Sequence, residues 1–257
     1  MITLVEVFFL NWHIIFLFLI IAILYSSVGF GGGSSYLAVL AITGIAYTQI
    51  RSTSLVCNII VVFSNVLLFQ KQNTFHWKKI LPLVFFSVPL AFLGGYLKIS
   101  QTIFFILLGI TLLIAAITMW LAKNTPVNKN KMNNASTTKN ISYGGGIGFI
   151  SGMVGIGGGI FLAPFLHLTN WDTPKKIAAT SSFFILVNSI AGLSGQYLNP
   201  DFLIDWKLTS ILLFTVFIGG QFGSRMSNKF FSPIQLKKAT AVLIAFVSIR
   251  ILIKHLF

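Results

Sequence analysis

Long apolar runs separated by short polar segments dominate this chain and predict a bundle of helices inside a membrane. The runs of the first half are approximately Val7 to Val28, Ser34 to Ala46, Thr53 to Phe69, Ile80 to Leu97 and Ile103 to Leu121. Those of the second half are approximately Ile141 to Val154, Ile160 to Leu168, Ala178 to Leu193, Leu208 to Gly223 and Leu236 to Ile253. Since about 20 apolar residues span a bilayer as a helix, we expect an all-α polytopic integral membrane protein with about 8 to 10 hydrophobic helices.

Two glycine clusters interrupt this pattern at matching places. Gly29-Phe30-Gly31-Gly32-Gly33 and Gly155-Ile156-Gly157-Gly158-Gly159 each follow a valine between apolar runs. Each glycine destabilises a helix by roughly 1 kcal/mol relative to alanine, so both clusters predict helix breaks. Inside a bilayer such a break persists only where protein or a water-filled cavity satisfies the backbone groups that it frees. The runs that follow, Ser34 to Ala46 and Ile160 to Leu168, are too short to span and predict half-helices.

The order of features in the first half returns in the second and predicts a duplication. The recurring positions are the two glycine clusters, Thr53-Ser54 with Thr180-Ser181, Trp77-Lys78 with Trp206-Lys207, and Gly94 with Gly223. The offset between matching positions drifts only from 126 to 129 residues. We therefore expect a first transmembrane repeat at 1–122, a polar basic linker at 123–140 and a second repeat at 141–257.

The distribution of cations predicts how the repeats lie in the membrane. If each glycine-centred pair of helices enters and leaves on one side, five of the 18 Lys and Arg residues share the face opposite the linker. These five are Arg51, Lys98, Lys207, Arg250 and Lys254. The other thirteen lie on the linker side, whereas one interrupted span per pair would divide the cations ten to eight. The positive-inside rule favours the first arrangement, which makes the repeats inverted, the linker cytoplasmic and both termini external, in the cell (inner) membrane.

Composition narrows the class of protein further. A mean hydropathy of +0.89 with 9% charged residues excludes an ordinary soluble domain, which carries about 25% charge. The net charge of +14 does not indicate a nucleic-acid partner, because the cations lie in loops between apolar runs. The first twelve residues contain Glu6 and no cation, unlike a cleavable signal peptide, so we expect the first run to be retained.

Each glycine break is a candidate binding site for an anion. A helix that starts after the break presents free N–H groups with about half a positive charge, and two such ends facing each other bind an anion without a charged side chain. The candidate residues are Gly29, Gly31, Gly32, Gly33, Gly155, Gly157, Gly158 and Gly159. Close packing of helices at small residues is the alternative interpretation. For Gly144 to Gly146, Gly219 and Gly220, packing is the favoured one.

Small polar residues accompany both breaks on the next long run. In the first half these are Thr53, Ser54, Asn58 and Asn65, and in the second they are Thr180, Ser181 and Asn188. Their spacing places each set on one helical face, where hydroxyl and amide donors suit the oxygens of an oxyanion. The alternative role for the same residues is to form interhelical hydrogen bonds, each worth about 0.6 kcal/mol. Anion binding and helix packing both remain open for them.

Ionisable residues are few, and none of the acids lies deep in a run. Glu6, Asp172, Asp201 and Asp205 are in or beside loops, which leaves His167 as the candidate for a proton relay. Arg51 and Lys175-Lys176 precede the Thr-Ser runs, where they either attract anions at an entrance or anchor the interface. The sequence has no Walker loop, no metal-spaced Cys/His cluster and no Ser/His/Asp set. We therefore expect neither an enzyme nor a metal or cofactor.

The stretches VGFGGG, RSTSL, VGIGGGIFLAP and AATSSFFILVNS resemble the sulfite exporter TauE/SafE family, the toluene sulfonate uptake permease group, over nearly the whole chain. The resemblance implies a bacterial-type membrane transporter, commonly of about eight helices, that moves sulfite, organosulfonates or related small anions. It implies a substrate role for the glycines of both breaks and for Thr53, Ser54, Thr180, Ser181 and Asn188. The chain departs from the family pattern at Ala38, where the second half has Pro164.

Together these features predict an exporter of a small sulfur-containing anion that works by alternating access around paired helix N-termini. An anion channel, or an intramembrane enzyme or lipid-interacting scaffold, is the alternative, because fold analogy alone does not prove function. The expected partners are a small anionic substrate and the lipid bilayer.

Overall fold

The computed structural model describes residues 3–121, 137–169, 171–226 and 233–256, and within these residues it contains eleven α-helices and no strand. The helices of the first half are α1 (Leu4–Leu10), α2 (Trp12–Ser27), α3 (Gly33–Ala41), α4 (Tyr47–Lys71), α5 (Trp77–Tyr96) and α6 (Gln101–Leu121). Those of the second half are α7 (Thr137–Val154), α8 (Gly159–Leu168), α9 (Pro174–Tyr197), α10 (Trp206–Met226) and α11 (Pro233–Leu256). The predicted linker 123–140 lies outside the described residues except for its last four, which begin α7.

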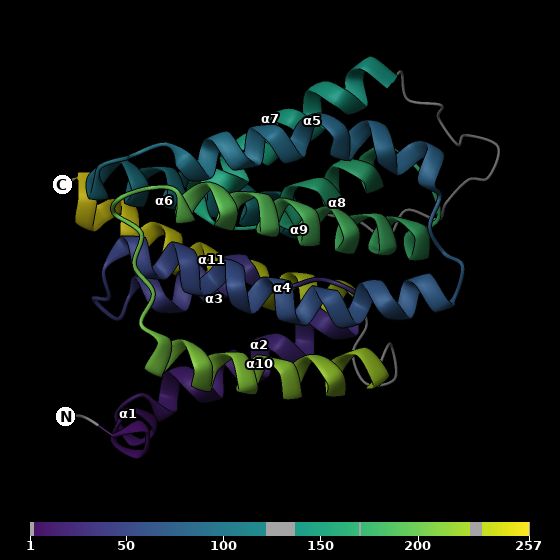
Figure 1. Ribbon diagram of the computed structural model, residues 1–257. Helices are drawn as coiled ribbons and strands as arrows, with labels where there is room; N and C mark the ends of the chain where they lie inside the picture. The colour runs from purple at the N-terminus through teal and green to yellow at the C-terminus, as the bar shows by residue number, and fades with distance from the viewer. Residues whose placement is uncertain (1–2, 122–136, 170, 227–232, 257) are drawn as a thin grey trace.

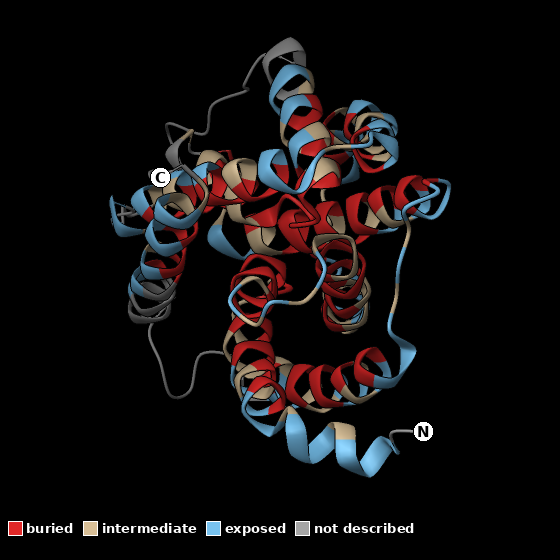
Figure 2. Ribbon diagram, turned by 90° about the vertical axis from the view of Figure 1, so that its left-hand side faces the viewer, coloured by how far each residue is buried: buried red, intermediate tan, exposed pale blue. Residues whose placement is uncertain are grey.

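The helices form a bundle with an apolar exterior. The long helices run side by side, and both chain termini lie at the same end of the bundle (Figure 1). By length and composition α4, α5, α6 and α9 can each cross a membrane. Figure 2 shows buried residues between the helices and exposed ones on their outer faces, where Phe9, Phe85 and Phe214 are each about 70% exposed. An outer surface of this kind suits lipid rather than water, so the predicted all-α polytopic membrane protein is confirmed.

The first apolar run, Val7 to Val28, is divided between two helices. It is interrupted at Asn11, where α1 and α2 meet at a bend of 76°. The Asn11 side chain donates from Nδ2 to the Val7 carbonyl at 3.0 Å, and its own carbonyl accepts the N–H groups of Ile14 and Ile15. One asparagine thus ends α1 and begins α2, and it adds a short helix to the eight to ten that the sequence predicts.

The two glycine clusters end and restart helices as expected. Gly32 and Gly158 are the N-cap residues of α3 and α8, with φ of +89° and +81° in the left-handed region that favours glycine. The half-helices α3 and α8 have nine and ten residues. At 1.5 Å per residue each is about 15 Å long, half the thickness of a bilayer core.

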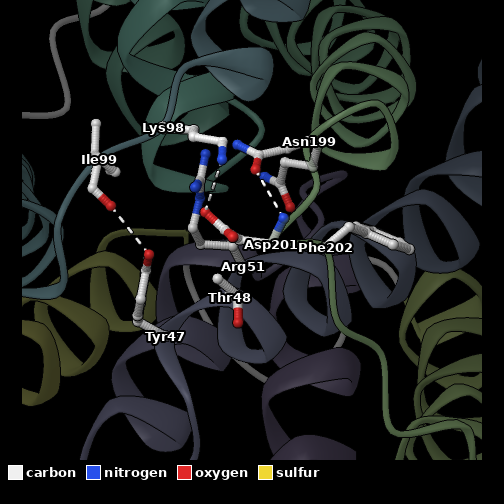
Figure 3. Close-up of a pocket in the computed structure, with 9 residues that line it drawn as sticks. Tyr47, Thr48, Arg51, Lys98, Ile99, Asn199, Asp201 and Phe202 are labelled. Carbon is white, nitrogen blue, oxygen red and sulfur yellow. Dashed lines mark hydrogen bonds and ion pairs between the residues drawn. The ribbon is translucent and has the colours of Figure 1, made fainter.

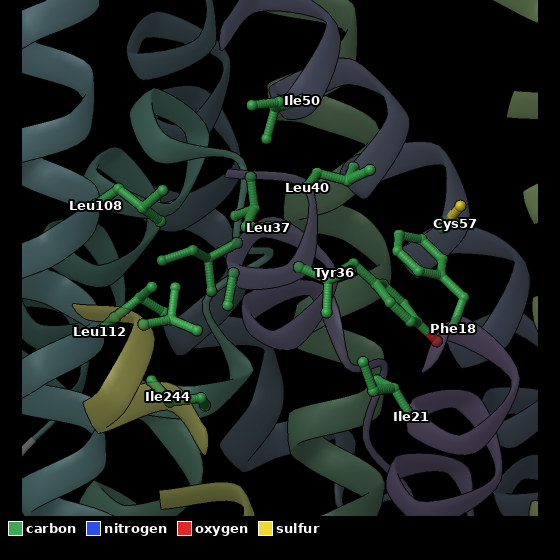
Figure 4. Packing of buried hydrophobic residues seen from close by; sticks show 14 of the residues in the cluster. Phe18, Ile21, Tyr36, Leu37, Leu40, Ile50, Cys57, Leu108, Leu112 and Ile244 are labelled. Carbon is green, nitrogen blue, oxygen red and sulfur yellow. The ribbon is translucent and has the colours of Figure 1, made fainter. Parts of the chain in front are cut away.

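The half-helix α3 lies in the centre of the bundle. Every residue from Gly33 to Leu40 is buried. Tyr36 stacks on Phe18 of α2 with ring centroids 4.5 Å apart, and side chains of α4, α6 and α11 surround Leu37 (Figure 4). Burial on all sides fixes the position of its N-terminus, which is the end that faces the glycine break.

Glycines let several helices cross with their backbones in contact. On α7 the spacing of Gly144, Gly148 and Gly152 places them on one face, where an added Cβ would overlap carbonyl groups of α5. At the corresponding crossing of α10 and α2, a Cβ at Gly223 would overlap the Ile23 carbonyl. The packing interpretation therefore holds for Gly144 and for Gly219, where an added Cβ would lie 2.8 Å from that of Ala22 and 2.9 Å from the Leu19 carbonyl oxygen. At Gly145 such a Cβ would lie 2.9 Å from the end of the Leu90 side chain, Gly220 makes only ordinary contacts, and Gly146 has no neighbour within 4 Å.

One buried carboxylate connects the two halves at the end of the bundle where α5 and α9 begin. Asp172, which is 2% exposed, lies 3.2 Å from His76 Nδ1 and 3.6 Å from the Nζ atoms of both Lys79 and Lys176. Burial raises the pKa of Asp172, but the Thr173 N–H, His76 and the two lysines outweigh this effect and hold the pKa below its ordinary value.

The Asp172 network predicts a pH-dependent contribution to stability. We expect Asp172→Asn to lower the free energy of unfolding by about 2 kcal/mol, or roughly 4–8 °C in thermal midpoint, at pH 7. Because the folded-state pKa is depressed, this contribution is complete above the unfolded-state pKa of about 4 and disappears as the pH falls through the folded value. Thermal unfolding in detergent at pH 7 and at about pH 2, well below the unfolded-state pKa, measures it. Asp201→Asn, which affects an exposed ion pair with Lys98, is the control and should change little. An equal effect at both pH values would contradict the prediction.

Candidate functional site

The two glycine breaks meet at a single side chain, the amide of Asn58 on α4. Its Oδ1 accepts the Gly33 N–H at 3.2 Å, in the first turn of α3. Its Nδ2 donates to the Ile156 carbonyl at 3.1 Å, inside the second break, and to Ser189 Oγ at 3.2 Å. Asn58 is 1% exposed. One buried amide therefore satisfies backbone groups from both halves of the chain.

Glycine is required where the backbone surrounds this amide. A Cβ at Gly31 would overlap Asn58 Oδ1, and one at Gly157 would overlap Asn58 Nδ2. A Cβ at Gly33 would lie 2.6 Å from the Ile156 carbonyl oxygen, so the breaks also touch each other directly. Gly157 has φ of +81°, a second reason for glycine there. Close packing, the alternative interpretation of the glycine clusters, is thus supported at these positions, and anion binding there stays a prediction.

Three of the four predicted polar residues of the first half form hydrogen bonds near the first break. Ser54 donates to the Gly33 carbonyl at 2.9 Å. Asn65 donates to the Phe30 carbonyl at 3.4 Å and accepts from Ser26 Oγ at 3.0 Å. The predicted set Ser54, Asn58 and Asn65 is thus brought together at the first break. Thr53 instead shares a hydrogen bond with Thr209 of α10, at 3.0 Å between the hydroxyl oxygens.

The second half is arranged differently. The hydroxyls of Thr180 and Ser181, both at most 1% exposed, have no hydrogen-bond partner within the described residues. Asn188 donates to Ser87 Oγ at 3.0 Å and to the Phe184 carbonyl of its own helix at 2.8 Å, while its Oδ1 has no described partner. Asn188 therefore faces α5 rather than the amide of Asn58.

Sequence register explains this difference. The offset of 127 residues places Ile185, not an amide, at the position that matches Asn58. A Cβ at Gly159 would accordingly overlap the Ile185 side chain. Thr53 bonds to Thr209, and the residue of the first half that matches Thr209, at an offset of 129, is Ile80. Thr180, which matches Thr53, therefore has no equivalent hydroxyl partner.

Two serines at the breaks were not among the predicted residues. Ser182 donates to the Gly29 carbonyl, and Ser189 accepts from Asn58. Ser182 follows the predicted Ser181 by one position, and Ser189 follows the predicted Asn188 by one. The polar spacing thus indicates this segment of α9 but not which of two adjacent residues faces the breaks.

No acidic side chain lies at the breaks. All four acidic residues of the chain lie outside the four long apolar helices. His167, the predicted relay, lies half-buried in the last turn of α8, about 12 Å along that helix from Gly159. Positive potential at the breaks therefore comes from the N-termini of α3 and α8 and from the buried Arg51, which lies against Gly155.

A pocket lies away from the breaks, at the end of the bundle where α4 begins and α9 ends. Its lining includes Tyr47, Arg51, Lys98, Asn199 and Asp201, which come from α4 and from the α5–α6 and α9–α10 connections (Figure 3). The sequence left two roles open for Arg51, attracting anions at an entrance or anchoring the interface. In the structure Arg51 is 3% exposed and lines this pocket.

These features define a multi-pass helical membrane protein with two helices broken inside the bundle, an architecture in which transporters place substrate sites. Comparison with known proteins agrees. The chain belongs to the sulfite exporter TauE/SafE family, whose model matches residues 14–251.

Individual relatives carry the same general description. The chain is 30% identical to the probable membrane transporter protein y4hK of Sinorhizobium fredii, over 91% of this chain and 95% of that protein. It is 27% identical to the probable membrane transporter protein YunE of Bacillus subtilis, over 69% and 71% respectively. No solved structure matches the chain. The protein is therefore a membrane transporter and not an enzyme, and both predictions are confirmed.

Gly158, which has a left-handed backbone conformation and precedes α8, allows a test of whether the second break tolerates a side chain. A Cβ at Gly158 would lie 2.8 Å from the Phe184 ring, in a backbone conformation that costs other residues roughly 1–2 kcal/mol. We expect Gly158→Ala to lower stability by about 3 kcal/mol, since it combines that strain with overpacking, and Gly158→Leu to abolish transport.

Two other glycines separate these effects. Gly44 has φ of +77° with no neighbour within 4 Å, so Gly44→Ala isolates the backbone strain. Gly146, inside α7, also has no neighbour within 4 Å and no positive φ, so Gly146→Ala should be neutral or stabilising. Thermal unfolding and anion flux in proteoliposomes measure all four variants. Equal losses in Gly158→Ala and Gly44→Ala, with normal flux in Gly158→Leu, would show that the break tolerates a side chain.

Proposed function

We propose that this protein exports a small sulfur-containing anion, such as sulfite or an organosulfonate, across the cell (inner) membrane by alternating access at the two glycine breaks. The observation that carries the proposal is the Asn58 amide, whose Oδ1 accepts a hydrogen bond from the first turn of α3. An oxygen of a bound anion would accept the same N–H group. The family to which the chain belongs supports the same class of substrate.

Substrate binding at the breaks requires Asn58 to move aside. An anion oxygen then takes the place of Oδ1 at the start of α3, with the Ser54 hydroxyl adjacent. The hydroxyls of Thr180 and Ser181, which have no described partner, supply further donors from the second half. Backbone and hydroxyl donors carry no full positive charge, so they bind an anion without holding it too tightly for release.

The proposed mechanism includes inverted repeats at 1–122 and 141–257 that exchange access between the two sides. Equivalent helix pairs support this arrangement, since α5 packs on α7 as α10 packs on α2. The position of both termini at one end of the bundle also supports it. The thirteen-to-five division of cations supports a cytoplasmic linker with both termini outside.

Topology can be tested with an accessible label. We expect a cysteine at Ala135, in the linker, to be protected from an impermeant thiol reagent in intact cells, while a C-terminal tag is accessible from outside. The reason is the excess of cations on the linker side. Because Cys57 is buried, it should not react and provides the background control. A labelled linker with a protected C-terminus would contradict the inverted arrangement.

Energetic coupling provides the direct test of export. We expect flux to follow the membrane potential without a coupling ion, because none of the four acids lies in a long apolar helix. A potential of 100 mV supplies about 2.3 kcal/mol per charge, which corresponds to roughly a 50-fold gradient of a monoanion. Saturable sulfite flux in proteoliposomes, with potential and pH gradient imposed separately, measures this coupling.

The same assay distinguishes the alternatives. Flux that does not saturate would indicate a channel, and absence of flux with every anion tried would indicate a scaffold. Flux that ignores a potassium potential set with valinomycin but follows pH, and loses that dependence in His167→Gln, would replace electrogenic export with proton coupling.

A further inference from the structure

Arg51 is a buried cation without a carboxylate partner. It lies in the second turn of α4 and is 3% exposed, and no described carboxylate lies within 4.0 Å of its guanidinium. Its Nη2 donates weakly to the Gly95 carbonyl at 3.5 Å, and its Nε has no described hydrogen-bond partner. A buried guanidinium with unused N–H groups is unfavourable unless an acceptor reaches it. An acceptor that reaches this guanidinium from the adjacent pocket would therefore stabilise it.

The guanidinium of Arg51 lies beside a small pocket that opens to solvent. The pocket lining brings Lys98, Gln196 and Asn199 near Arg51 (Figure 3). The side-chain amides of Gln196 and Asn199 already donate to backbone carbonyls, at 3.5 and 3.2 Å, which positions them at the pocket wall. The lining thus combines two cations with polar groups on neighbouring elements.

Asp201 is the only acid in the pocket lining, and it is paired with Lys98. The Nζ and Oδ2 atoms are 3.7 Å apart, and both side chains are more than half exposed. An exposed pair of this kind is weak and exchanges readily with solvent ions. Arg51 is therefore the unpaired positive charge of the pocket.

We propose that this pocket is an anion-binding vestibule in which Arg51 is the principal ligand of a small oxyanion. The planar guanidinium offers its N–H groups to two oxygens at once, and Lys98 adds a second contact when it leaves Asp201. The matching position in the second half is Ala178, so the second half has no arginine at the equivalent place. The identity of the physiological anion, sulfite or a sulfonate, rests on the proposed function.

The vestibule lies close to the glycine breaks. Arg51 precedes Asn58 by seven residues on α4, which corresponds to about 10 Å along the helix. A Cβ at Gly155 would lie 3.2 Å from the Arg51 Cα, so the second break packs directly against the backbone of this arginine. An anion bound at Arg51 is thus two helical turns from the proposed central site.

Binding of sulfite and methanesulfonate to the full chain in phosphatidylcholine nanodiscs tests the vestibule. By calorimetry we expect Arg51→Gln to weaken binding at least about tenfold and Arg51→Lys about threefold, because lysine keeps the charge but loses the two-pronged contact. Arg250→Gln, which removes an exposed cation of α11, should leave binding unchanged. Equal affinities for Arg51→Gln and the unmodified protein would overturn the proposal.

Two exposed positions test the same site without disturbing the buried arginine. Asp201→Asn should strengthen binding about threefold because it frees Lys98, and Lys98→Gln should weaken it about twofold. Opposite shifts in these variants support the vestibule even if Arg51→Gln does not fold, and no shift in either overturns it.

Two further comparisons identify the ligand and separate this inference from the proposed function. If phosphatidylglycerol, but neither soluble anion, stabilises the protein in an Arg51-dependent manner, the pocket binds a lipid headgroup and the proposal is wrong. Arg51-dependent binding without flux in proteoliposomes would leave the vestibule standing and reject the transport substrate. Normal flux together with unchanged binding in Arg51→Gln would reject the vestibule and leave the proposed transport function standing.

Discussion

Backbone groups that a broken helix leaves inside a membrane must find hydrogen-bond partners, and the centre of this protein depends on that constraint. The Asn58 amide meets it for both halves, since it accepts from Gly33 and donates to the Ile156 carbonyl. The glycines around it exist because any side chain would occupy the same space. The buried position of α3 follows, since its N-terminus must stay in register with this amide.

The two ends of the bundle differ in charge arrangement. At one end Asp172 is buried among His76 and two lysines and joins the halves through the connections before α5 and α9. At the other end Arg51 lines a pocket and has no described carboxylate within 4.0 Å, while Asp201 in the same lining pairs with Lys98. The 20 residues of α5 separate these ends by about 30 Å, the thickness of a bilayer core. One end thus contains a buried carboxylate with three cationic partners, and the other a buried arginine without a carboxylate partner.

Much of the site was predictable from single residues, but its pairings were not. The glycine clusters, Ser54, Asn58 and Asn65 were recognised because breaks and polar spacing are local properties of the chain. Ser182 and Ser189 were missed because helical spacing defines a face only to within one residue, whereas a hydrogen bond depends on the rotation of the helix against its neighbour. Asn188 belongs to the predicted stripe of the second half that matches the one with Asn58, yet its side chain binds Ser87 of α5.

The sequence by itself determined the membrane class, the two breaks, the half-helices and the family, because apolar run length and glycine content act locally along the chain. It did not determine that Asn11 ends α1, that one amide serves both breaks, or that Arg51 is buried beside a pocket. Those features arise where segments distant in sequence come together, as Gly155 does with Arg51 and Gly33 with Ile156. Only tertiary packing decides which polar group faces another and which remains without a partner.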